Sequence, residues 1–419
     1  MRIVLVSTYE LGHQPFSLAS PKAWLVRAGH EVTAVDLAKT KLPEDLIRQA
    51  DRVAFSLPMH TATRLAVPVI ERVKLLNPSA RIACYGLYAP LNRELLEGLG
   101  VEAIMGGEFE PALVAWANGE NFSEISLDKL TFIKPDRSDV LPSRVAYTEA
   151  SRGCKHVCRH CPVVPVYQGE FRVVQRDVVL DDIRQQIAQG SSHVTFGDPD
   201  FFNGPTHAMR IAEALHAEFP QVTYDATIKI EHLLKHRDLL VPLRDTGCLF
   251  VTTAVESLDD AILAKLEKNH TRHDFFEVVN LARKTGLALQ PTFIAFTPWT
   301  TIENYRELLR VLKDLELVEN VSSIQLALRL LITTSSRLLE LDDIRSIIGP
   351  FDRRLLVYPW QGPLDDLAGR IFRIVANKGL NRTEMFAAIW AEASDEPLPE
   401  NFHLVPRAAV PYLDEPWYC

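Results

Sequence analysis

Three cysteines near the middle of the chain, Cys154, Cys158 and Cys161, have a spacing that suits metal chemistry. They form the pattern C-x3-C-x2-C, and three thiolates on one short loop can hold three irons of a [4Fe–4S] cluster. The fourth iron then has no protein ligand, so it is open to a substrate or a cofactor. The spacing therefore predicts a cluster that takes part directly in chemistry, whereas a fully ligated cluster is suited mainly to electron transfer.

Two other interpretations of these cysteines stay open at this point. They could bind zinc, with His156 or His160 as the fourth ligand. A zinc ribbon normally carries a second C-x2-C pair about 15–20 residues further on, and the chain has none there. They could also be free thiols, although three of the chain's six cysteines fall within one short stretch, which favours a shared ligand.

With His160 as a ring side chain just before the last cysteine, the loop resembles the signature of the radical S-adenosylmethionine (AdoMet) enzymes. The resemblance implies that the amino and carboxylate groups of AdoMet chelate the open iron. It also implies that one electron, from a donor such as flavodoxin or ferredoxin, cleaves a carbon–sulfur bond of AdoMet and releases a carbon radical. The expected function is a radical AdoMet enzyme that acts on a small-molecule substrate.

Composition agrees with a soluble enzyme of more than one domain. A chain of 419 residues is too long for one ordinary core, and 47% hydrophobic with 24% charged residues is typical of globular proteins. A net charge of −9 argues against nucleic acid as the main partner. No apolar run approaches membrane-spanning length, and no signal peptide precedes the first strand. Unpaired cysteines favour a cytoplasmic location.

Alternating strand and helix patterns predict an α/β protein. Residues 1–126 alternate five times between a buried strand and an amphipathic helix, which predicts a doubly wound, Rossmann-like parallel sheet. Residues 127–143 are polar and are expected to form a linker. Residues 144–345 predict six further strands, the last at Ser323–Ile332, and resemble the partial (β/α)6 barrel of the radical AdoMet family. Residues 346–419 are expected to form a C-terminal extension and tail.

The N-terminal unit resembles the cobalamin-binding-like module that often precedes a radical AdoMet core. Besides the order of elements, residues 106–110 (Gly-Gly-Glu-Phe-Glu) are similar to the Gly-Glu turn of that module's last strand. The module's cobalt ligand is the histidine of Asp-x-His-x-x-Gly after the first strand. Here His13 lies in that loop without the aspartate and the glycine, so we expect an ordinary loop histidine. Cobalamin, bound without a histidine ligand, is kept as an alternative cofactor.

Acidic residues follow the second predicted barrel strand, at the edge where such barrels place their active sites. Gly197, Asp198 and Asp200 stand where the family has a turn that holds the AdoMet amino group, and we expect all three to contact the cofactor. A plain acidic turn without a ligand is the simpler alternative.

Further candidates for AdoMet contacts follow or lie in the later strands. Lys229 ends the third strand, while Glu256 and Ser257 end the fourth and resemble the family's Glu-Ser contact to the AdoMet ribose. For Glu256 the alternative is a surface ion pair with a lysine. Arg329 lies within the otherwise apolar sixth strand, where a guanidinium costs several kcal/mol unless it is paired. A bound carboxylate, such as that of AdoMet, would supply the pair.

The end of the chain carries a second resemblance. Tyr147–Cys154, Gly197–Asn203 and the terminal Trp417–Cys419 together resemble the radical AdoMet family with a Cys-Sec-Ala-Glu-Pro or Cys-Cys-Ala-Glu-Pro tail. The resemblance implies a catalytic Cys419, the first member of a vicinal pair that binds a soft electrophile such as arsenite or acts in redox chemistry. A selenocysteine codon read as a stop would explain the end of the chain, and an engineered truncation is the alternative.

Three rival functions share the same loop. A cobalamin-dependent radical methyltransferase would bind a corrin as well as AdoMet. Transfer of a 3-amino-3-carboxypropyl group to a metalloid held by the tail, resembling the arsinothricin pathway, would break a different AdoMet bond. A cluster-bearing redox sensor would cleave no AdoMet at all.

Overall fold

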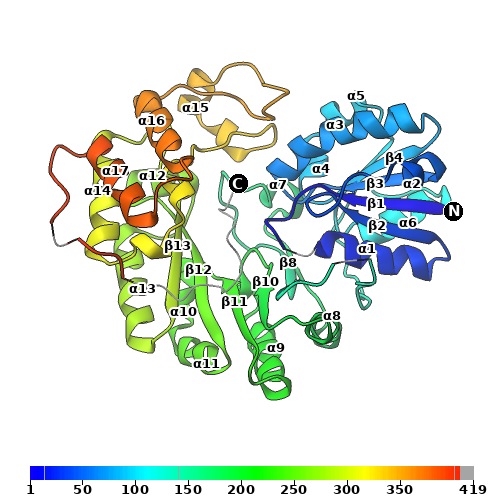
Figure 1. Ribbon diagram of the computed structural model, residues 1–419, viewed down its shortest axis with the longest axis horizontal. Helices are drawn as coiled ribbons and strands as arrows, with labels where there is room; N and C mark the ends of the chain where they lie inside the picture. Colours follow the sequence, from blue (N-terminus) through cyan, green and yellow to red (C-terminus); the bar gives the residue numbers. More distant parts are fainter. Residues whose placement is uncertain (14, 140, 401, 406–419) are drawn as a thin grey trace.

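The computed structural model describes residues 1–13, 15–139, 141–400 and 402–405 (Figure 1). Two parallel sheets, each with its own helices, lie side by side, and the segment that carries the three cysteines lies between them. A further group of helices follows the second sheet. The chain is therefore an α/β protein, as its alternating patterns predict.

The first sheet is parallel throughout and has the strand order β2-β1-β3-β4-β5-β6. Its strands are β1 (Arg2–Ser7), β2 (Glu31–Asp36), β3 (Arg52–Ser56), β4 (Arg81–Tyr85), β5 (Ala103–Gly107) and β6 (Ile125–Ser126). Its helices are α1 (Phe16–Arg27), α2 (Glu44–Gln49), α3 (His60–Leu76), α4 (Tyr88–Leu91), α5 (Arg93–Gly98) and α6 (Glu110–Asn118).

Both faces of the first sheet are buried, which is why its strands are apolar runs rather than alternating ones. In β1, Ile3 and Leu5 pack into the core on one face, whereas Val4 and Val6 pack into the core on the other. Successive side chains of a strand point to opposite faces, so a doubly covered strand needs apolar residues at every position. The strand order reverses direction at β1, and ligands of such sheets bind outside the carboxyl ends of the strands at this switch point.

The second sheet is also parallel, with the order β13-β12-β11-β10-β7. Its strands are β7 (Val145–Thr148), β10 (His193–Phe196), β11 (Thr223–Thr227), β12 (Cys248–Glu256) and β13 (Ala288–Phe293). Its helices are α8 (Arg176–Ala188), α9 (Pro205–Glu218), α10 (Ile230–Lys235), α11 (Leu240–Asp245), α12 (Asp260–Leu266), α13 (Arg272–Thr285) and α14 (Ile302–Asp314). A small antiparallel pair, β8 (Ser151–Gly153) and β9 (Phe171–Val173), encloses the cysteine loop and the short helix α7 (Val164–Tyr167).

The predicted sixth strand of the barrel, Ser323–Ile332, is wrong. Its first part is a 3-10 helix, Ser323–Leu326, and only one isolated parallel bridge, between Phe296 and Arg329, continues the sheet. The backbone N–H of Phe293 donates to the side-chain oxygen of Gln325 at 3.0 Å. Because a side chain takes up the hydrogen bond that a sixth strand would have made, the ladder does not start there.

The C-terminal residues pack against the second unit and also contact the first. They contain α15 (Asp342–Ile347), α16 (Asp365–Val375) and α17 (Arg382–Ala393), of which α16 and α17 contribute to the core of the second sheet. One ring nitrogen of His60, at the start of α3, lies 2.8 Å from the carbonyl oxygen of Leu355. Among the residues in view, no helix is both long and apolar enough to cross a membrane.

Candidate functional site

The cysteine loop begins at a residue that has to be glycine. Gly153 has a φ of +76°, and a Cβ at this position would collide with the carbonyl oxygen of Glu170 and with the ring of Tyr167. An L side chain is disfavoured at that φ and has no room here. The glycine of the Ser-Arg-Gly-Cys stretch therefore turns the chain from β8 into the loop.

Two of the three thiols, Cys154 and Cys158, are buried, and Cys161 is half-buried. Cys154 and Cys158 are 7% and 6% exposed, and the backbone N–H of Cys161 donates to the carbonyl of Cys158 at 3.1 Å in a tight turn. Burial, together with the neighbouring Cys158 and Cys154, raises the pKa of Cys161 to about 12. Thiols with this environment stay protonated without metal and lose their protons when a metal binds. The loop fits three ligands of an iron–sulfur cluster.

Asn203 holds the loop in this shape. Its side chain accepts from the backbone N–H of Lys155 at 3.2 Å and donates to the carbonyl of Gly153 at 3.3 Å. The Sγ atom of Cys154 lies 3.9 Å from the same amide oxygen. Asn203 is fully buried. It reaches the cysteine loop only because the turn after β10 folds back onto that loop, a contact between segments that are distant in the sequence.

Two buried lysines flank the thiols. The Nζ atom of Lys229, which follows β11, lies 3.7 Å from the Sγ atom of Cys158. Lys268, between α12 and α13, is 2% exposed, and the neighbouring Cys158 and Cys161 contribute to its raised pKa. Three thiolates on a [4Fe–4S] cluster carry a net negative charge, and two buried ammonium groups stabilise it. Lys229 was predicted from its strand end, whereas nothing in the sequence around Lys268 signals its position.

Glu256 is brought to the cysteine loop. It ends β12 with a φ of +69°, at a point where the register to β13 shifts. Its carboxylate accepts from Lys268 Nζ at 3.1 Å and lies 3.3 Å from Nε2 of His160. Burial alone would raise the pKa of Glu256, but Lys268 and His160 hold it well below its usual range. A backbone strained in this way at a strand end is typical of a functional position.

The structure places the carboxylate of Asp198, a predicted AdoMet contact, against the start of the cysteine loop. One oxygen accepts from the backbone N–H of Ala150 at 2.9 Å and the other from the hydroxyl of Ser151. Burial raises the pKa of Asp198 to about 7, while these hydrogen bonds oppose the rise. Because both oxygens are used, Asp198 positions the entry to the cysteine loop.

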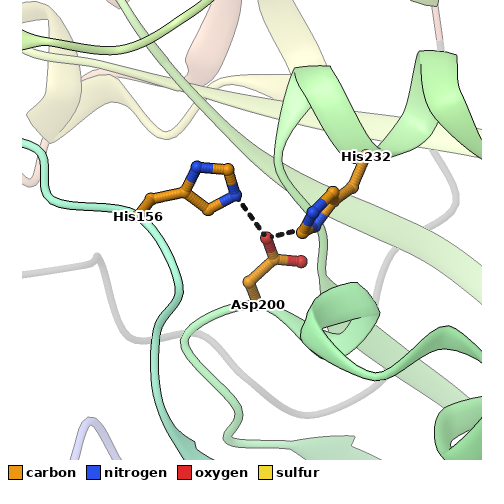
Figure 2. Close-up of side chains that lie close together, drawn as sticks. All are labelled: His156, Asp200 and His232. Carbon is orange, nitrogen blue, oxygen red and sulfur yellow. Dashed lines mark ion pairs between the residues drawn. The ribbon is translucent and has the colours of Figure 1, made fainter. Parts of the chain in front are cut away.

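The neighbouring residues of this turn also have partners or neighbours within the chain. The backbone N–H of Gly197 donates to the carbonyl of Thr148 at 2.8 Å, and a Cβ on Gly197 would collide with the phenol of Tyr147. Asp200 turns toward His156 and His232 (Figure 2). The turn after β10 is thus built into the site, and its contacts to AdoMet stay a prediction.

Arg329 is not the unpaired cation that the sequence suggests. It lies outside any strand, donates to Asp365 at 2.6 Å and to the carbonyl of Trp360 at 3.0 Å, and lies over the Trp360 ring at 4.0 Å. The argument for a bound carboxylate at Arg329 is therefore wrong, because Asp365 of α16 supplies the pair.

Two further residues were predicted to belong to the site, Ser257 and Cys419. Ser257 follows Glu256, accepts from the backbone N–H of Asp259 at 3.1 Å, and lines a cavity of about 370 Å³ at the ends of β12 and β13. Cys419, the predicted catalytic thiol of the tail, lies outside the described residues.

A buried ion network joins the first sheet to the cysteine loop. Arg152 of β8 donates to Glu110 at 2.7 Å and to Glu149 at 2.7 Å, and it lies 3.4 Å from Glu108. Burial raises the pKa of Glu108 to about 7, although Arg152 opposes the rise, while Arg152 and Ser20 help to keep the pKa of Glu110 below its usual value. The two glutamates of the Gly-Gly-Glu-Phe-Glu turn thus fix the loop's position between the two units.

Glu10, after β1, is another buried acid of the first unit. It accepts from the hydroxyl of Ser17, and burial is the main cause that raises its pKa to about 8. An acid whose pKa is higher in the folded protein than in the unfolded chain favours folding while it is protonated. Its contribution to the free energy of unfolding is complete below the pKa of the unfolded chain and is lost as the pH rises through the pKa of the folded protein. Between about pH 5 and 8 the free energy of unfolding should therefore fall as the pH rises, and one such group adds a slope of up to about 1.4 kcal/mol per pH unit. We expect this fall to be less steep in Glu10→Gln. Urea unfolding at several pH values measures this slope.

The control for this titration is an exposed acid. Glu213 on α9 is exposed, and Glu213→Gln should leave the pH profile as it is in the unsubstituted protein. Because Glu108 and Asp198 also have raised pKa values, part of the slope persists in Glu10→Gln. An identical slope in Glu10→Gln and the unsubstituted protein would contradict a buried, protonated Glu10.

Comparisons with known proteins agree with this arrangement. Residues 148–322 match the model of the radical SAM (AdoMet) superfamily. The uS12 methylthiotransferase RimO of Parabacteroides distasonis is 24% identical over 194 residues, which are 43% of this chain and 44% of that protein. The hopanoid C-3 methylase of Methylococcus capsulatus is 24% identical over 323 residues, which are 68% of this chain and 62% of that protein.

Two solved structures resemble nearly the whole chain. The cobalamin-dependent radical enzyme OxsB, with aqua-cobalamin and AdoMet bound, has a TM-score of 0.67 at 15% identity and covers 89% of this chain and 65% of its own. The radical AdoMet methyltransferase TsrM of Kitasatospora setae has a TM-score of 0.66 at 13% identity and covers 94% of this chain and 89% of its own. At such identities the likeness is one of fold.

The matched segment contains the three cysteines, the lysines beside them and the carboxyl ends of β10 to β13. Residues 148–322, which include the cysteine loop, are thus similar to the radical SAM superfamily. The chain spans about half of the length of the first curated relative and 62% of the second, so its particular reaction is a matter for proposal.

Proposed function

We propose that this protein holds a [4Fe–4S] cluster on Cys154, Cys158 and Cys161 and cleaves AdoMet to start radical chemistry on a small molecule. A cluster held there would supply the electron that breaks a carbon–sulfur bond of AdoMet. The observation that supports the proposal is the gathering of three thiols on one loop beside the buried Lys229 and Lys268, within the segment that matches the radical SAM superfamily. The electron comes from a donor of the flavodoxin or ferredoxin type.

The chain's own residues have defined tasks in this proposal. Asn203 and Asp198 fix the loop, and Lys229 and Lys268 offset the negative charge of the thiolates. Glu256 and Ser257 lie at the strand end where a ribose hydroxyl would be held, and Glu256 is ionised at neutral pH because Lys268 and His160 contact it. A carboxylate is a strong acceptor for hydroxyl donors.

Anaerobic incubation with AdoMet and dithionite tests the proposal. We expect the iron-loaded protein to convert AdoMet into a nucleoside, identified by mass spectrometry, at a rate that depends on the reductant. 5′-Deoxyadenosine is the expected product. Methylthioadenosine would instead support transfer of a 3-amino-3-carboxypropyl group, with Cys419 as the proposed holder of a metalloid. No nucleoside product at all would support a redox sensor.

Cobalamin-dependent methyl transfer is a second candidate, favoured by the fold likeness to OxsB and TsrM over both units. The cavity at this edge of the first sheet is small for a corrin, and its histidine is not placed as a cobalt ligand. The cavity between Ser56, Gly86, Gly107 and the cysteine loop measures about 200 Å³, below the 300–1,000 Å³ typical even of sites for drug-sized ligands. The ring of His13 is buried and stacks on Tyr147 at 4.8 Å, so it is not open to cobalt. Corrin absorbance in protein dialysed against hydroxocobalamin would support this candidate over the first.

A further inference from the structure

A second group of ligand-type side chains lies beside the cysteine loop and has no part in the proposed cluster. It consists of His156, Asp200 and His232 (Figure 2). His156 lies between Cys154 and Cys158, Asp200 precedes the 3-10 helix after β10, and His232 lies on α10. Three segments that are distant in sequence thus bring their ligand atoms within 4.8 Å of one another.

These side chains are buried and their facing atoms have no hydrogen bonds. The side chains of His156, Asp200 and His232 are 9%, 0% and 7% exposed. Asp200 Oδ1 accepts from the backbone N–H of Phe202 at 3.1 Å, whereas Oδ2 faces Nδ1 of His232 at 2.7 Å and Nε2 of His156 at 3.8 Å. None of these three facing atoms is in hydrogen-bond geometry with any described residue.

Buried polar atoms almost always have a partner, so three such atoms that point at one another indicate a missing common partner. Asp200 is the informative member, because its Oδ2 has zero exposure and meets only two imidazole nitrogens at ion-pair distance, neither in hydrogen-bond geometry. A buried carboxylate of this kind is costly unless a cation meets it. Two imidazole nitrogens on either side of that oxygen complete the donor set of a metal ion.

A further carboxylate lies near one of the ligands. Nδ1 of His156 lies 3.5 Å from Oε2 of Glu231, at ion-pair distance but without a hydrogen bond between them. Metal-bound histidines commonly donate their other ring N–H to a carboxylate, which fixes the tautomer and makes the ligating nitrogen more basic. Glu231 is close enough to take this role when a metal holds Nε2 of His156.

We propose that His156, Asp200 and His232 bind one zinc ion beside the cysteine loop. Two imidazoles and one carboxylate form the donor set of catalytic zinc sites and of mononuclear non-haem iron sites, and they leave positions open for another ligand. Zinc bonds of 2.0–2.2 Å place ligand atoms about 3.4 Å apart. The ligand atoms, now within 4.8 Å of one another, would move closer together on binding. An oxygen or nitrogen donor of the substrate completes the coordination and lies next to the loop.

Metal analysis of the iron-loaded protein tests this site with the cysteines already occupied. After anaerobic cluster reconstitution and equilibrium dialysis against zinc chloride, we expect one zinc per chain in addition to the iron. X-ray absorption at the zinc edge should find nitrogen and oxygen neighbours and no sulfur. In His232→Ala the zinc Kd should rise about 100-fold or more, since even outer partners of metal ligands are worth 10–100-fold. The iron content should not change.

Two variants keep the test decisive. Asp200→Asn retains an oxygen for the N–H of Phe202 and removes the charge, so a well-folded protein that has lost its zinc supports the site. His273→Ala changes an exposed histidine on α13 and should bind zinc as the unsubstituted protein does. The proposal is overturned if no zinc binds beyond background, if sulfur surrounds the zinc, or if Asp200→Asn and His232→Ala bind it unchanged.

Discussion

A chain in which Cys154, Cys158 and Cys161 are all replaced by alanine is expected to lose its iron and all reductive cleavage of AdoMet. The reason is that each thiol supplies one ligand, whereas the other two cysteines of the described residues, Cys84 and Cys248, lie within strands β4 and β12. Cluster reconstitution followed by iron and sulfide analysis should give about four of each in the unsubstituted protein and none in the variant. The loss should be complete rather than graded.

A matched control removes the two cysteines that lie in strands. Cys84 in β4 and Cys248 in β12 are buried as small apolar side chains, and burial raises the pKa of both. The variant Cys84→Ala/Cys248→Ala should keep its iron, with some loss of stability from the removed packing. Iron retained by the triple variant, or zinc alone bound by the cysteines of the unsubstituted protein, would refute the cluster.

Replacement of Arg152 by methionine is expected to lower the free energy of unfolding by about 3–5 kcal/mol, the usual effect of removing one partner from a buried ion pair. The substitution leaves Glu108 and Glu110, both at zero exposure, without their cation. The carboxylates then become protonated more readily, so the destabilisation should be larger at pH 8 than at pH 5. Urea unfolding at the two pH values measures both effects.

The same substitution at an exposed arginine separates this effect from the loss of a charge alone. Arg184 on α8 pairs with Glu218 and Asp181 at the surface, where such pairs contribute about 0–1 kcal/mol. Arg184→Met should therefore change little at either pH. Equal stability losses in the two variants would mean that the network between the units does not hold the cysteine loop in place.

The sequence determines those parts of the site that depend on neighbours along the chain. Ligands for one cluster lie within a single loop, so their spacing alone predicts the iron chemistry, and the turn that precedes them needs Gly153. The two sheets could also be predicted, because apolar strands covered on both faces leave a repeated pattern that does not depend on distant contacts. Radical SAM chemistry was predicted from the same loop and agrees with the matched segment, residues 148–322.

Contacts between distant segments were decided by the tertiary structure alone. Asp198 and Asp200 are two residues apart, yet one accepts from the loop after β7 and the other faces His232. Arg329 looked unpaired because its partner, Asp365, lies on a helix 36 residues away.

The surroundings of Lys268 and Arg152 were likewise decided by the tertiary structure. Each is buried among acids or thiols that the chain brings together only after its helices pack onto the sheets. The free energy of a buried charge depends on which groups surround it in space. Residue types and their spacing carry no record of those surroundings, so the roles of these side chains emerge only with the folded chain.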